Sequence, residues 1–260
     1  MNETADHWRR PSRVLRDLEA PRAIGELVAY YTSRPMARFA QRGDGHGVLV
    51  LPGLLASDRS TRPLRAFLHR LGYDARPWRL GRNLGPTDAV MDGLPRRLGD
   101  LHATTGRPVS VVGVSLGGSY ARDLARVHPD LVRQVITLGS PFRLPVKYAG
   151  RHLTHAEGIY RALGPRHSRR IVERPEEDDL PPLPVPATAI YTRSDGVVPW
   201  RACLEREGPT SESVEVRGSH SGLGHNPLAL AVIADRLAQP RGSWQRYRRP
   251  TRRGGAVPAA

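Results

Sequence analysis

Short apolar runs alternate along the chain with longer segments whose apolar residues recur at helical spacing. Val48 to Leu51 is a continuous apolar run stopped by Pro52 and Gly53, which is typical of a strand buried on both faces of a sheet. The segment that follows repeats its apolar residues at i, i+3, i+4 and i+7, a spacing that predicts an amphipathic helix ending at Gly72. Those residues are Leu64, Phe67, Leu68 and Leu71.

The same alternation of strand and helix continues along the chain. Further strands are predicted over residues 73–78, 109–112, 135–138, 187–191 and 214–216. The helices between and after them are expected to turn the following residues inward: Met91, Leu94, Leu98 and Leu101; Tyr120, Leu124 and Val127; Leu230, Ile233, Ala234 and Leu237. Strands separated by helices predict an α/β fold with a doubly wound, mostly parallel sheet.

Three segments depart from this alternation. Residues 1–42 predict a helical extension, interrupted by Pro21 and Pro35, that packs on another part of the protein, and residues 43–240 predict the α/β domain. Its partly periodic apolar residues are Val14, Leu18, Ile24, Leu27, Val28 and Tyr31. The polar, proline-rich segment at about 142–184 is expected to form an inserted cap. The tail, residues 241–260, has six arginines and no acidic residue and is expected to be disordered.

One short motif lies where a catalytic nucleophile would be presented. Gly113-Val114-Ser115-Leu116-Gly117 fits the pattern Gly-x-Ser-x-Gly, which is weak evidence alone in a chain with 26 glycines. Its context is more specific, because the motif separates a buried apolar strand from a predicted helix, as a nucleophile elbow requires. The glycines two residues before and after the serine, Gly113 and Gly117, let the strand and the helix approach. The motif therefore predicts Ser115 as a nucleophile.

A serine hydroxyl needs a base to remove its proton and an acid to orient that base. In a sheet of this kind those partners follow the serine in the order Asp, His, each after a later strand. Asp195 and His220 each follow a predicted strand end and are the preferred pair. The alternatives are Asp178 or Asp179, in a charge run of the expected cap, and His225, which lies nearer the last helix.

Acyl transfer also needs donors aimed at the oxygen that becomes negative in the tetrahedral intermediate. The backbone N–H of Leu116, directly after the nucleophile, is one predicted donor. The other is the N–H of Leu54, after the Pro52-Gly53 turn that ends the first strand. No pair of histidines has a convincing metal-ligand context, so neither a metal nor a cofactor is expected.

The charge of the chain is strongly positive. The formal net charge is +15, and Lys147 is the only lysine, so arginine supplies 39 of the 40 basic side chains. A solvated arginine-rich surface is the preferred interpretation, and attraction to an anionic membrane surface is the alternative; nucleic acid is not an expected partner. Cys203 is the only cysteine, and neither a secretory signal nor an apolar run of about 18 residues is recognised, which predicts a cytoplasmic protein.

Several of these stretches together resemble the α/β-hydrolase superfamily, and within it bacterial lipases and esterases of the triacylglycerol-lipase type. The similarity covers about residues 46–238. The stretches are Val50 to Leu54, Gly113 to Gly118, Thr137 to Pro141, Ser194 to Pro199 and Gly218 to Leu223. The resemblance implies a lid over an acyl-binding pocket, at about residues 142–184.

The resulting prediction is a serine hydrolase that cleaves a small-molecule or lipid ester. Ser115 would attack the acyl carbonyl, His220 would carry the proton, and Asp195 would orient the imidazole. An acyltransferase that uses the same three residues is the first alternative. A hydrolase fold without catalysis that binds an anionic surface is the second.

Overall fold

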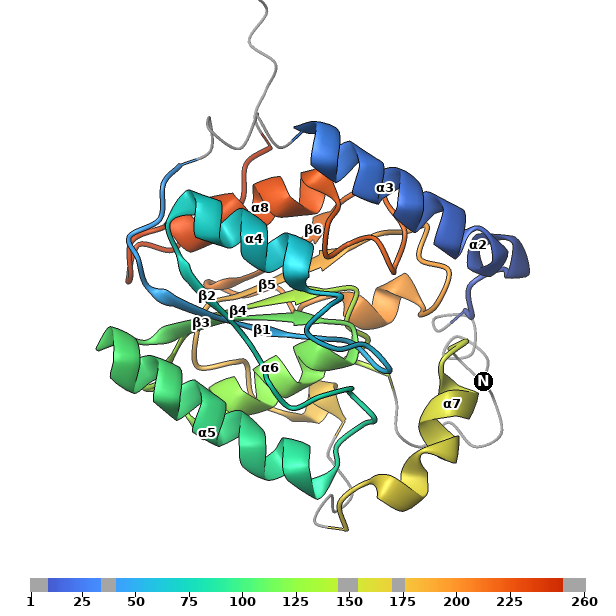
Figure 1. Ribbon diagram of the computed structural model, residues 1–260, viewed down its shortest axis with the longest axis horizontal. Helices are drawn as coiled ribbons and strands as arrows, with labels where there is room; N and C mark the ends of the chain where they lie inside the picture. The colour runs from blue at the N-terminus through green and yellow to red at the C-terminus, as the bar shows by residue number, and fades with distance from the viewer. Residues whose placement is uncertain (1–8, 34–40, 145–153, 170–175, 250–260) are drawn as a thin grey trace, which may run out of the picture.

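The strands of the protein form one parallel sheet. In the computed structural model, which describes residues 9–33, 41–144, 154–169 and 176–249, six strands lie in the order β2-β1-β3-β4-β5-β6, and all neighbouring pairs are parallel (Figure 1). They are β1 (Gly47–Leu51), β2 (Asp74–Pro77), β3 (Val109–Val114), β4 (Val132–Leu138), β5 (Ala187–Tyr191) and β6 (Ser211–Glu215). The predicted doubly wound α/β architecture is confirmed.

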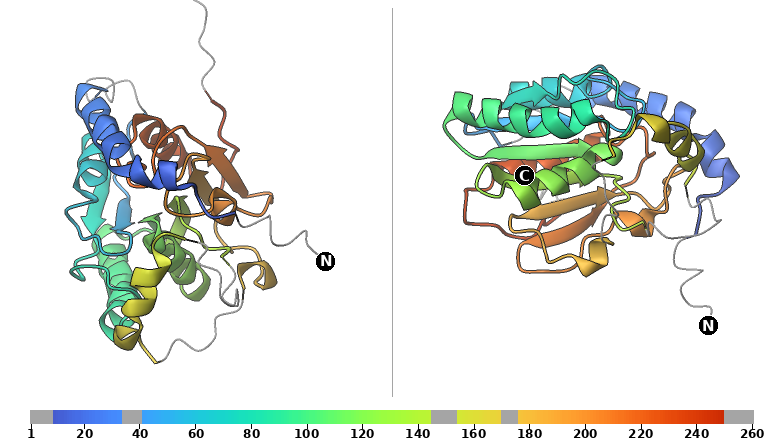
Figure 2. Two further views of the ribbon diagram at one scale, coloured as in Figure 1. Left: turned by 90° about the vertical axis from the view of Figure 1, so that its right-hand side faces the viewer. Right: turned by 90° about the horizontal axis from the view of Figure 1, so that it is seen from below.

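Helices cover both faces of this sheet. On one face lie α4 (Arg62–Leu71) and α8 (Pro227–Ala238), and on the other lie α5 (Asp88–Thr105) and α6 (Leu116–Val127) (Figures 1 and 2). The helices that connect successive parallel strands thus lie on both faces of the sheet, and each face has its own apolar core.

The side chains of β1 point alternately to the two faces of the sheet and so contribute to both apolar cores. Val48 and Val50 pack in the core under α4 and α8, whereas Leu49 and Leu51 pack in the core over α5 and α6, and all four are fully buried. Successive strand residues point to opposite faces, so a strand covered on both sides must be apolar throughout. This is the physical reason for the continuous apolar run.

Two inward-facing predictions on the helices of the second core are wrong. Met91 is 39% exposed, and Val90, four residues before the buried Leu94, is buried in its place at the start of α5. Val127 is 70% exposed and is the last residue of α6. The other residues predicted to face inward on α5, α6 and α8 are buried.

The helical extension consists of α2 (Arg13–Asp17) and α3 (Glu19–Ser33), which lie at the periphery of the molecule in every view (Figures 1 and 2). Pro21 does not interrupt α3, because it stands in the first turn, where backbone N–H groups have no intrahelical acceptor. Tyr30 is buried and Leu27 partly buried against the core. The remaining apolar residues expected to pack inward are exposed: Val14, Leu18, Ile24, Val28 and Tyr31.

The region expected to form a cap is described in two pieces, since residues 145–153 and 170–175 lie outside the described residues. The first piece holds α7 (Glu157–Ala162) and a 3-10 turn, η2 (Gly164–Arg166). The amide of His155 donates to the carbonyl of Val197 at 3.0 Å, and the amide of Ser168 donates to that of Pro86 at 2.9 Å. This piece therefore connects the loop after β5 with the segment before α5.

The second piece contains a buried ion cluster and not only solvated charges. Glu177, in η3 (Glu177–Asp179), bonds Arg122 and Arg126 of α6, both at 2.6 Å, and Glu205 bonds the same Arg122. The Arg122 side chain is 2% exposed, and its guanidinium lies 3.9 Å from the centre of the Phe142 ring. Glu177 is therefore a buried and paired member of the charge run in the expected cap.

The basic tail begins as an ordered segment. Residues 250–260 lie outside the described residues, but the amide of Tyr247 donates to a Glu212 carboxylate oxygen at 2.7 Å and its ring packs against the core. The carbonyl of Gln245 accepts a bond from Arg236 of α8. Over residues 241–249 the structure thus differs from the disorder expected from composition, because buried charges on the domain supply partners for this segment.

Replacement of Arg122 by alanine is expected to lower the free energy of unfolding by about 3–5 kcal/mol, because the buried Glu205 loses its counter-charge and the buried Glu177 keeps Arg126 but loses Arg122. Urea denaturation measures the change. The control is Arg16→Ala, which removes a surface pair to Asp17 whose two side chains are 45% and 63% exposed, and should change the free energy of unfolding by less than about 1 kcal/mol. Equal effects of the two substitutions would contradict the importance of the buried cluster.

Candidate active site

The motif around Ser115 forms a strained turn between β3 and α6. Ser115 has φ 49° and ψ −123°, one of three non-glycine residues of the described chain with positive φ. A Cβ on Gly117 would lie 2.6 Å from the Leu51 carbonyl oxygen, and one on Gly113 would lie 2.3 Å from the Gly117 carbonyl oxygen. Only glycine fits at these two positions, so the predicted strand-turn-helix elbow is what the structure contains.

The side chains of Ser115, His220 and Asp195 form a continuous chain of hydrogen bonds. Nε2 of His220 lies 3.1 Å from Oγ of Ser115, and Nδ1 of His220 lies 2.7 Å from Oδ2 of Asp195. Asp195 follows β5 and His220 follows β6, and both residues are buried, with 3% and 8% exposed. Parallel strands end at one edge of the sheet, which is why three residues distant in sequence meet there. The structure brings together the three side chains singled out from the sequence.

The carboxylate of Asp195 is fixed by its own turn. Its Oδ1 accepts hydrogen bonds from the amides of Val197 and Val198, both at 2.8 Å, which leaves Oδ2 directed at His220. Bonded in this way, Asp195 holds the imidazole with the proton on Nδ1 and the lone pair of Nε2 toward Ser115.

The electrostatic surroundings of His220 favour its protonated form. Burial by itself lowers the pKa of this histidine, but the Asp195 carboxylate, through charge and hydrogen bond, and the Glu19 carboxylate, through charge, raise the pKa above the ordinary histidine value. A raised pKa makes the imidazole a better proton acceptor once it is neutral.

The rival residues lie elsewhere. Asp178 forms a bidentate pair with Arg143 at 2.8 and 2.9 Å. Asp179 belongs to the same short η3 helix and not to a strand-end turn. Nε2 of His225 donates to the carbonyl of Ala23 at 2.9 Å, so this ring nitrogen holds a proton and cannot accept one from the serine.

The two predicted backbone donors flank Ser115. Leu116 is the first residue of α6, where an amide has no intrahelical acceptor. Leu54 follows Gly53, and a Cβ on Gly53 would lie only 3.1 Å from Cβ of Ser115, so this loop passes against the nucleophile. Within the described part of the chain, neither amide has a hydrogen-bond partner. Both are therefore available to a ligand oxygen beside Ser115.

The loop that carries Leu54 is held by Asn83, which the sequence did not single out. The buried Asn83 side-chain amide donates to the Pro52 carbonyl at 2.9 Å, and its backbone carbonyl accepts from Leu55 at 2.7 Å. Its side-chain oxygen accepts from the Tyr120 hydroxyl at 3.3 Å. A buried asparagine 29 residues along the chain cannot be linked to this loop without the fold.

Sequence reasoning also missed Glu19 of α3, which is 7% exposed. One of its carboxylate oxygens accepts from the amides of Gly196 and His220, at 2.8 and 3.2 Å, and the other accepts from the amide of Ser221 at 3.0 Å. Arg22 donates to the first oxygen at 2.8 Å. A single buried carboxylate thus joins the loop of Asp195 to the loop of His220.

Other polar residues on the same face of α3 bond the same loops. Arg22 donates to the Ser194 carbonyl at 2.8 Å, and Glu26 accepts from the Ser219 amide at 2.7 Å and from the Asn226 side chain at 3.0 Å. Glu19, Arg22 and Glu26 are spaced i, i+3 and i+7, a polar stripe that the sequence displays. This polar stripe is the sequence signal that could have identified Glu19 as a buried residue of the site.

A second contact of the same three residue types lies at the opposite edge of the sheet. Nε2 of His46 lies 2.8 Å from Oγ of Ser110, and its Nδ1 lies 2.5 Å from a carboxylate oxygen of Asp44. His46 and Ser110 are fully buried, and burial lowers the pKa of His46. No substrate carbonyl reaches a hydroxyl without exposed surface, so this trio is structural.

Neither a metal centre nor a reactive thiol is found among the described residues. No group of three or more histidine, cysteine, aspartate or glutamate side chains in them is placed to hold a metal ion. Cys203 is 1% exposed, and burial raises the pKa of its thiol well above the usual value, which suits packing and not nucleophilic attack.

Comparison with known proteins gives similarity of structure and not of sequence. No family model matches the chain, and no curated protein matches it. Among solved structures, lipase B of Aspergillus fumigatus aligns at 17% identity and a TM-score of 0.55, covering 76% of this chain and 54% of that one. The chain therefore spans about half the length of that lipase.

Two further structures are covered almost completely. The pyrethroid hydrolase PytH aligns at 19% identity and a TM-score of 0.51, over 76% of this chain and 99% of that one. MGS-MChE2, an α/β-hydrolase enzyme from the metagenome of lagoon sediments at Mar Chica, Morocco, aligns at 17% identity and a TM-score of 0.51, over 75% and 91%. At identities this low the alignments show the fold alone. Together with the parallel sheet and the elbow, these structural alignments establish that the chain has the α/β-hydrolase fold.

Proposed function

We propose that this protein is a serine hydrolase that cleaves carboxylic esters through an acyl-enzyme on Ser115. The observation that carries the proposal is the chain of contacts from Ser115 through His220 to Asp195, at 3.1 and 2.7 Å, at the edge of the sheet where the strands end. Structural neighbours named as a lipase and a pyrethroid hydrolase support an ester-cleaving role.

In the first half-reaction, Oγ of Ser115 attacks the acyl carbonyl carbon while Nε2 of His220 takes the hydroxyl proton. The amides of Leu54 and Leu116 bind the oxyanion of the tetrahedral intermediate. When this intermediate collapses, the ester C–O bond breaks and His220 gives the proton to the departing alcohol. Asp195 stays ionised throughout and stabilises the imidazolium.

In the second half-reaction, a water molecule attacks the acyl-enzyme after His220 removes one of its protons. The intermediate releases the carboxylic acid and Ser115 recovers its proton. If an alcohol or a thiol replaced water here, the protein would be an acyltransferase. Product analysis with added acceptor alcohols separates the two, because an acyltransferase would lose little acyl group to water.

Substitution of Ser115 by alanine is expected to lower kcat for a short chromogenic ester by roughly 10⁵- to 10⁶-fold and to abolish covalent labelling by a fluorophosphonate. Mass spectrometry of the wild-type protein should find the label on Ser115. The control is Ser110→Ala, which removes the buried serine at the other edge and should leave labelling intact. Retention of labelling and esterase activity in Ser115→Ala would refute the proposal.

The pH dependence follows from the raised pKa of His220. The reaction needs the neutral imidazole, so kcat/KM should rise as pH increases through a pKa above the ordinary histidine value of about 6.5. Asp195→Asn removes the carboxylate that raises this pKa, so the acidic limb should move to lower pH while kcat falls by about 10⁴-fold. If the acidic limb of kcat/KM stays at the same pH in Asp195→Asn, His220 is not the base that titrates there.

We also propose Glu19 as a positioning residue for the catalytic loops. In Glu19→Gln the amide nitrogen replaces an acceptor that faces backbone donors, and the charge that helps raise the pKa of His220 is lost. We expect kcat to fall by about ten- to a hundredfold and the acidic limb of kcat/KM to move to lower pH.

Glu26→Gln is the matched comparison, because Glu26 bonds Ser219 in the same loop but does not contribute to the pKa of His220. The acidic limb should stay in place in this variant. A shift of the same size in both variants would show that Glu19 acts only by holding the loops together.

A further inference from the structure

Helix α3 turns charged as well as apolar residues toward the domain and leaves other apolar residues on its outward face. Its charged residues Glu19, Arg22 and Glu26 point inward and bond the loops of Asp195 and His220. On the outward face, Ile24 is 64% exposed and Val28 is 57% exposed. A surface helix normally buries its apolar stripe and exposes its charges.

The exposed apolar residues continue onto α2. Val14 is 66% exposed and Leu18 is 46% exposed, and with Ile24 and Val28 they form what we call the apolar ridge. Of the ten large hydrophobic side chains exposed in the described chain, four belong to the ridge. Single exposed apolar residues are common on soluble proteins, but a row along two consecutive helices marks an interaction surface.

Positive charge surrounds the start of this ridge. Arg9, Arg10, Arg13 and Arg16 are exposed, and Asp17 is the only exposed acidic residue within 9–33. Asp17 pairs with Arg16 at 2.8 Å, whereas Glu19 and Glu26 are turned inward. The surface offered by α2 and α3 is therefore apolar along its length and cationic at its N-terminal end.

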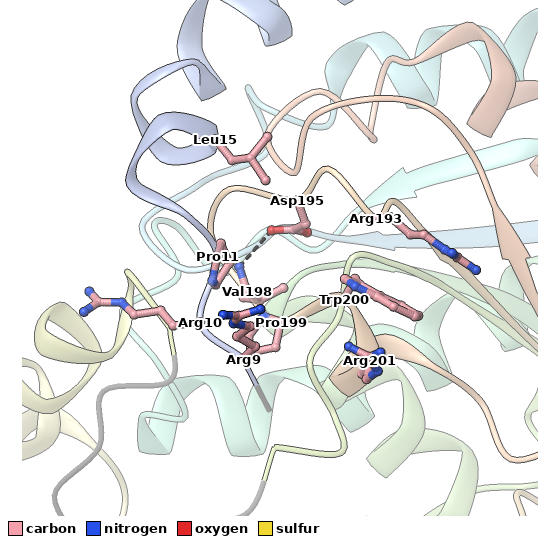
Figure 3. Close-up of a pocket in the computed structure, with 10 residues that line it drawn as sticks. All are labelled: Arg9, Arg10, Pro11, Leu15, Arg193, Asp195, Val198, Pro199, Trp200 and Arg201. Atoms are coloured by element: carbon pink, nitrogen blue, oxygen red, sulfur yellow. Dashed lines mark hydrogen bonds between the residues drawn. The ribbon is translucent and has the colours of Figure 1, made fainter. Parts of the chain in front are cut away.

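A small hollow beside α2 adds to this charge. Figure 3 shows it between the N-terminal segment and the loop after β5, with a volume of about 160 Å³. Four arginines line it, Arg9, Arg10, Arg193 and Arg201, and we call it the arginine hollow. Leu15 of α2 also lines it, so the hollow adjoins the ridge.

Trp200 gives the hollow an aromatic wall. The guanidinium carbons of Arg193 and Arg201 lie 5.0 and 4.6 Å from the centre of its ring. Within the hollow the one carboxylate is that of Asp195, which is buried and bonded to His220. Arginine and tryptophan beside an apolar surface are the side chains that suit the head-group layer of a membrane.

We propose that the apolar ridge and the arginine hollow dock the protein on an anionic phospholipid surface. The ridge would enter the acyl boundary of the leaflet, and the arginines would bind the phosphate groups. None of the described helices has the length and hydropathy needed to cross a bilayer, so the contact is peripheral. The bound face is also the outer side of the helix that holds the catalytic loops.

Charge distinguishes this occupant from a second copy of the chain. A dimer through α2 and α3 would bring the same arginines of two molecules together, each molecule with a net charge of +15. A lipid surface instead supplies opposite charge and an apolar layer side by side. Nucleic acid supplies the charge but offers no apolar partner for the ridge.

The test is co-sedimentation of the full chain with vesicles of phosphatidylcholine alone, or of equal parts of phosphatidylcholine and phosphatidylglycerol. The Ser115→Ala protein is used, so that binding is measured whether or not the protein is an esterase. We expect binding to the mixed vesicles that weakens as salt rises, and little binding to the neutral vesicles. Ile24→Glu with Val28→Glu should weaken binding by at least about tenfold.

Val127→Glu is the matched control, because Val127 is 70% exposed on α6, away from the ridge, and this variant should bind like the parent. Arg9→Gln with Arg201→Gln should weaken binding to the mixed vesicles by about tenfold or more, and binding to neutral vesicles not at all. Far-UV circular dichroism and a thermal melt of each variant check that it is folded, independently of any esterase activity.

Two outcomes would overturn the proposal. In one, the ridge variant binds vesicles as well as the parent, or binding is lost only when residues 250–260 are removed, which would assign the membrane contact to the tail. In the other, light scattering shows a dimer that the ridge variant dissociates and vesicles bind neither form, which would assign the ridge to a second copy.

Discussion

The close approach of β1, β3 and α6 at the elbow is the constraint on which the site depends. Gly117 lies against the Leu51 carbonyl, and Gly113 lies against Gly117, so no side chain can be added at either position without moving a backbone. This contact holds Ser115 at a positive φ and presents its hydroxyl above the ends of the strands. The same contact brings the end of β1, and with it Gly53, against Ser115.

The second requirement is that two separate loops hold Asp195 and His220 in register, and in this chain the N-terminal helix helps to meet it. Glu19 receives amide hydrogen bonds from both loops, and Arg22 and Glu26 bind further backbone atoms of the same loops. Buried carboxylates are costly unless their hydrogen-bonding capacity is used, and here four donors use that of Glu19. The extension is therefore part of the site's framework.

The contrast between the two Ser-His-Asp contacts shows what the residue types alone do not decide. At Ser110 the hydroxyl is fully buried, and it also lies 3.4 Å from the side-chain nitrogen of Gln134. Ser115 is only partly buried, and the amides of Leu54 and Leu116 have no hydrogen-bond partner within the described part of the chain. Similar hydrogen bonds thus stabilise the fold at one edge of the sheet and suit acyl transfer at the other.

The sequence by itself determined the order of the strands and helices, the elbow, and the three residues Ser115, Asp195 and His220. These features are local, because the spacing of apolar residues, the positions of glycines and the ends of strands can each be recognised within a short stretch of sequence. Only the tertiary structure decided which residues complete the site, because Glu19 and Asn83 act through contacts with segments 177 and 31 residues away. The structure likewise turned the polar stripe of α3 inward, since buried backbone amides of the loops that carry Asp195 and His220 need acceptors that solvent cannot supply.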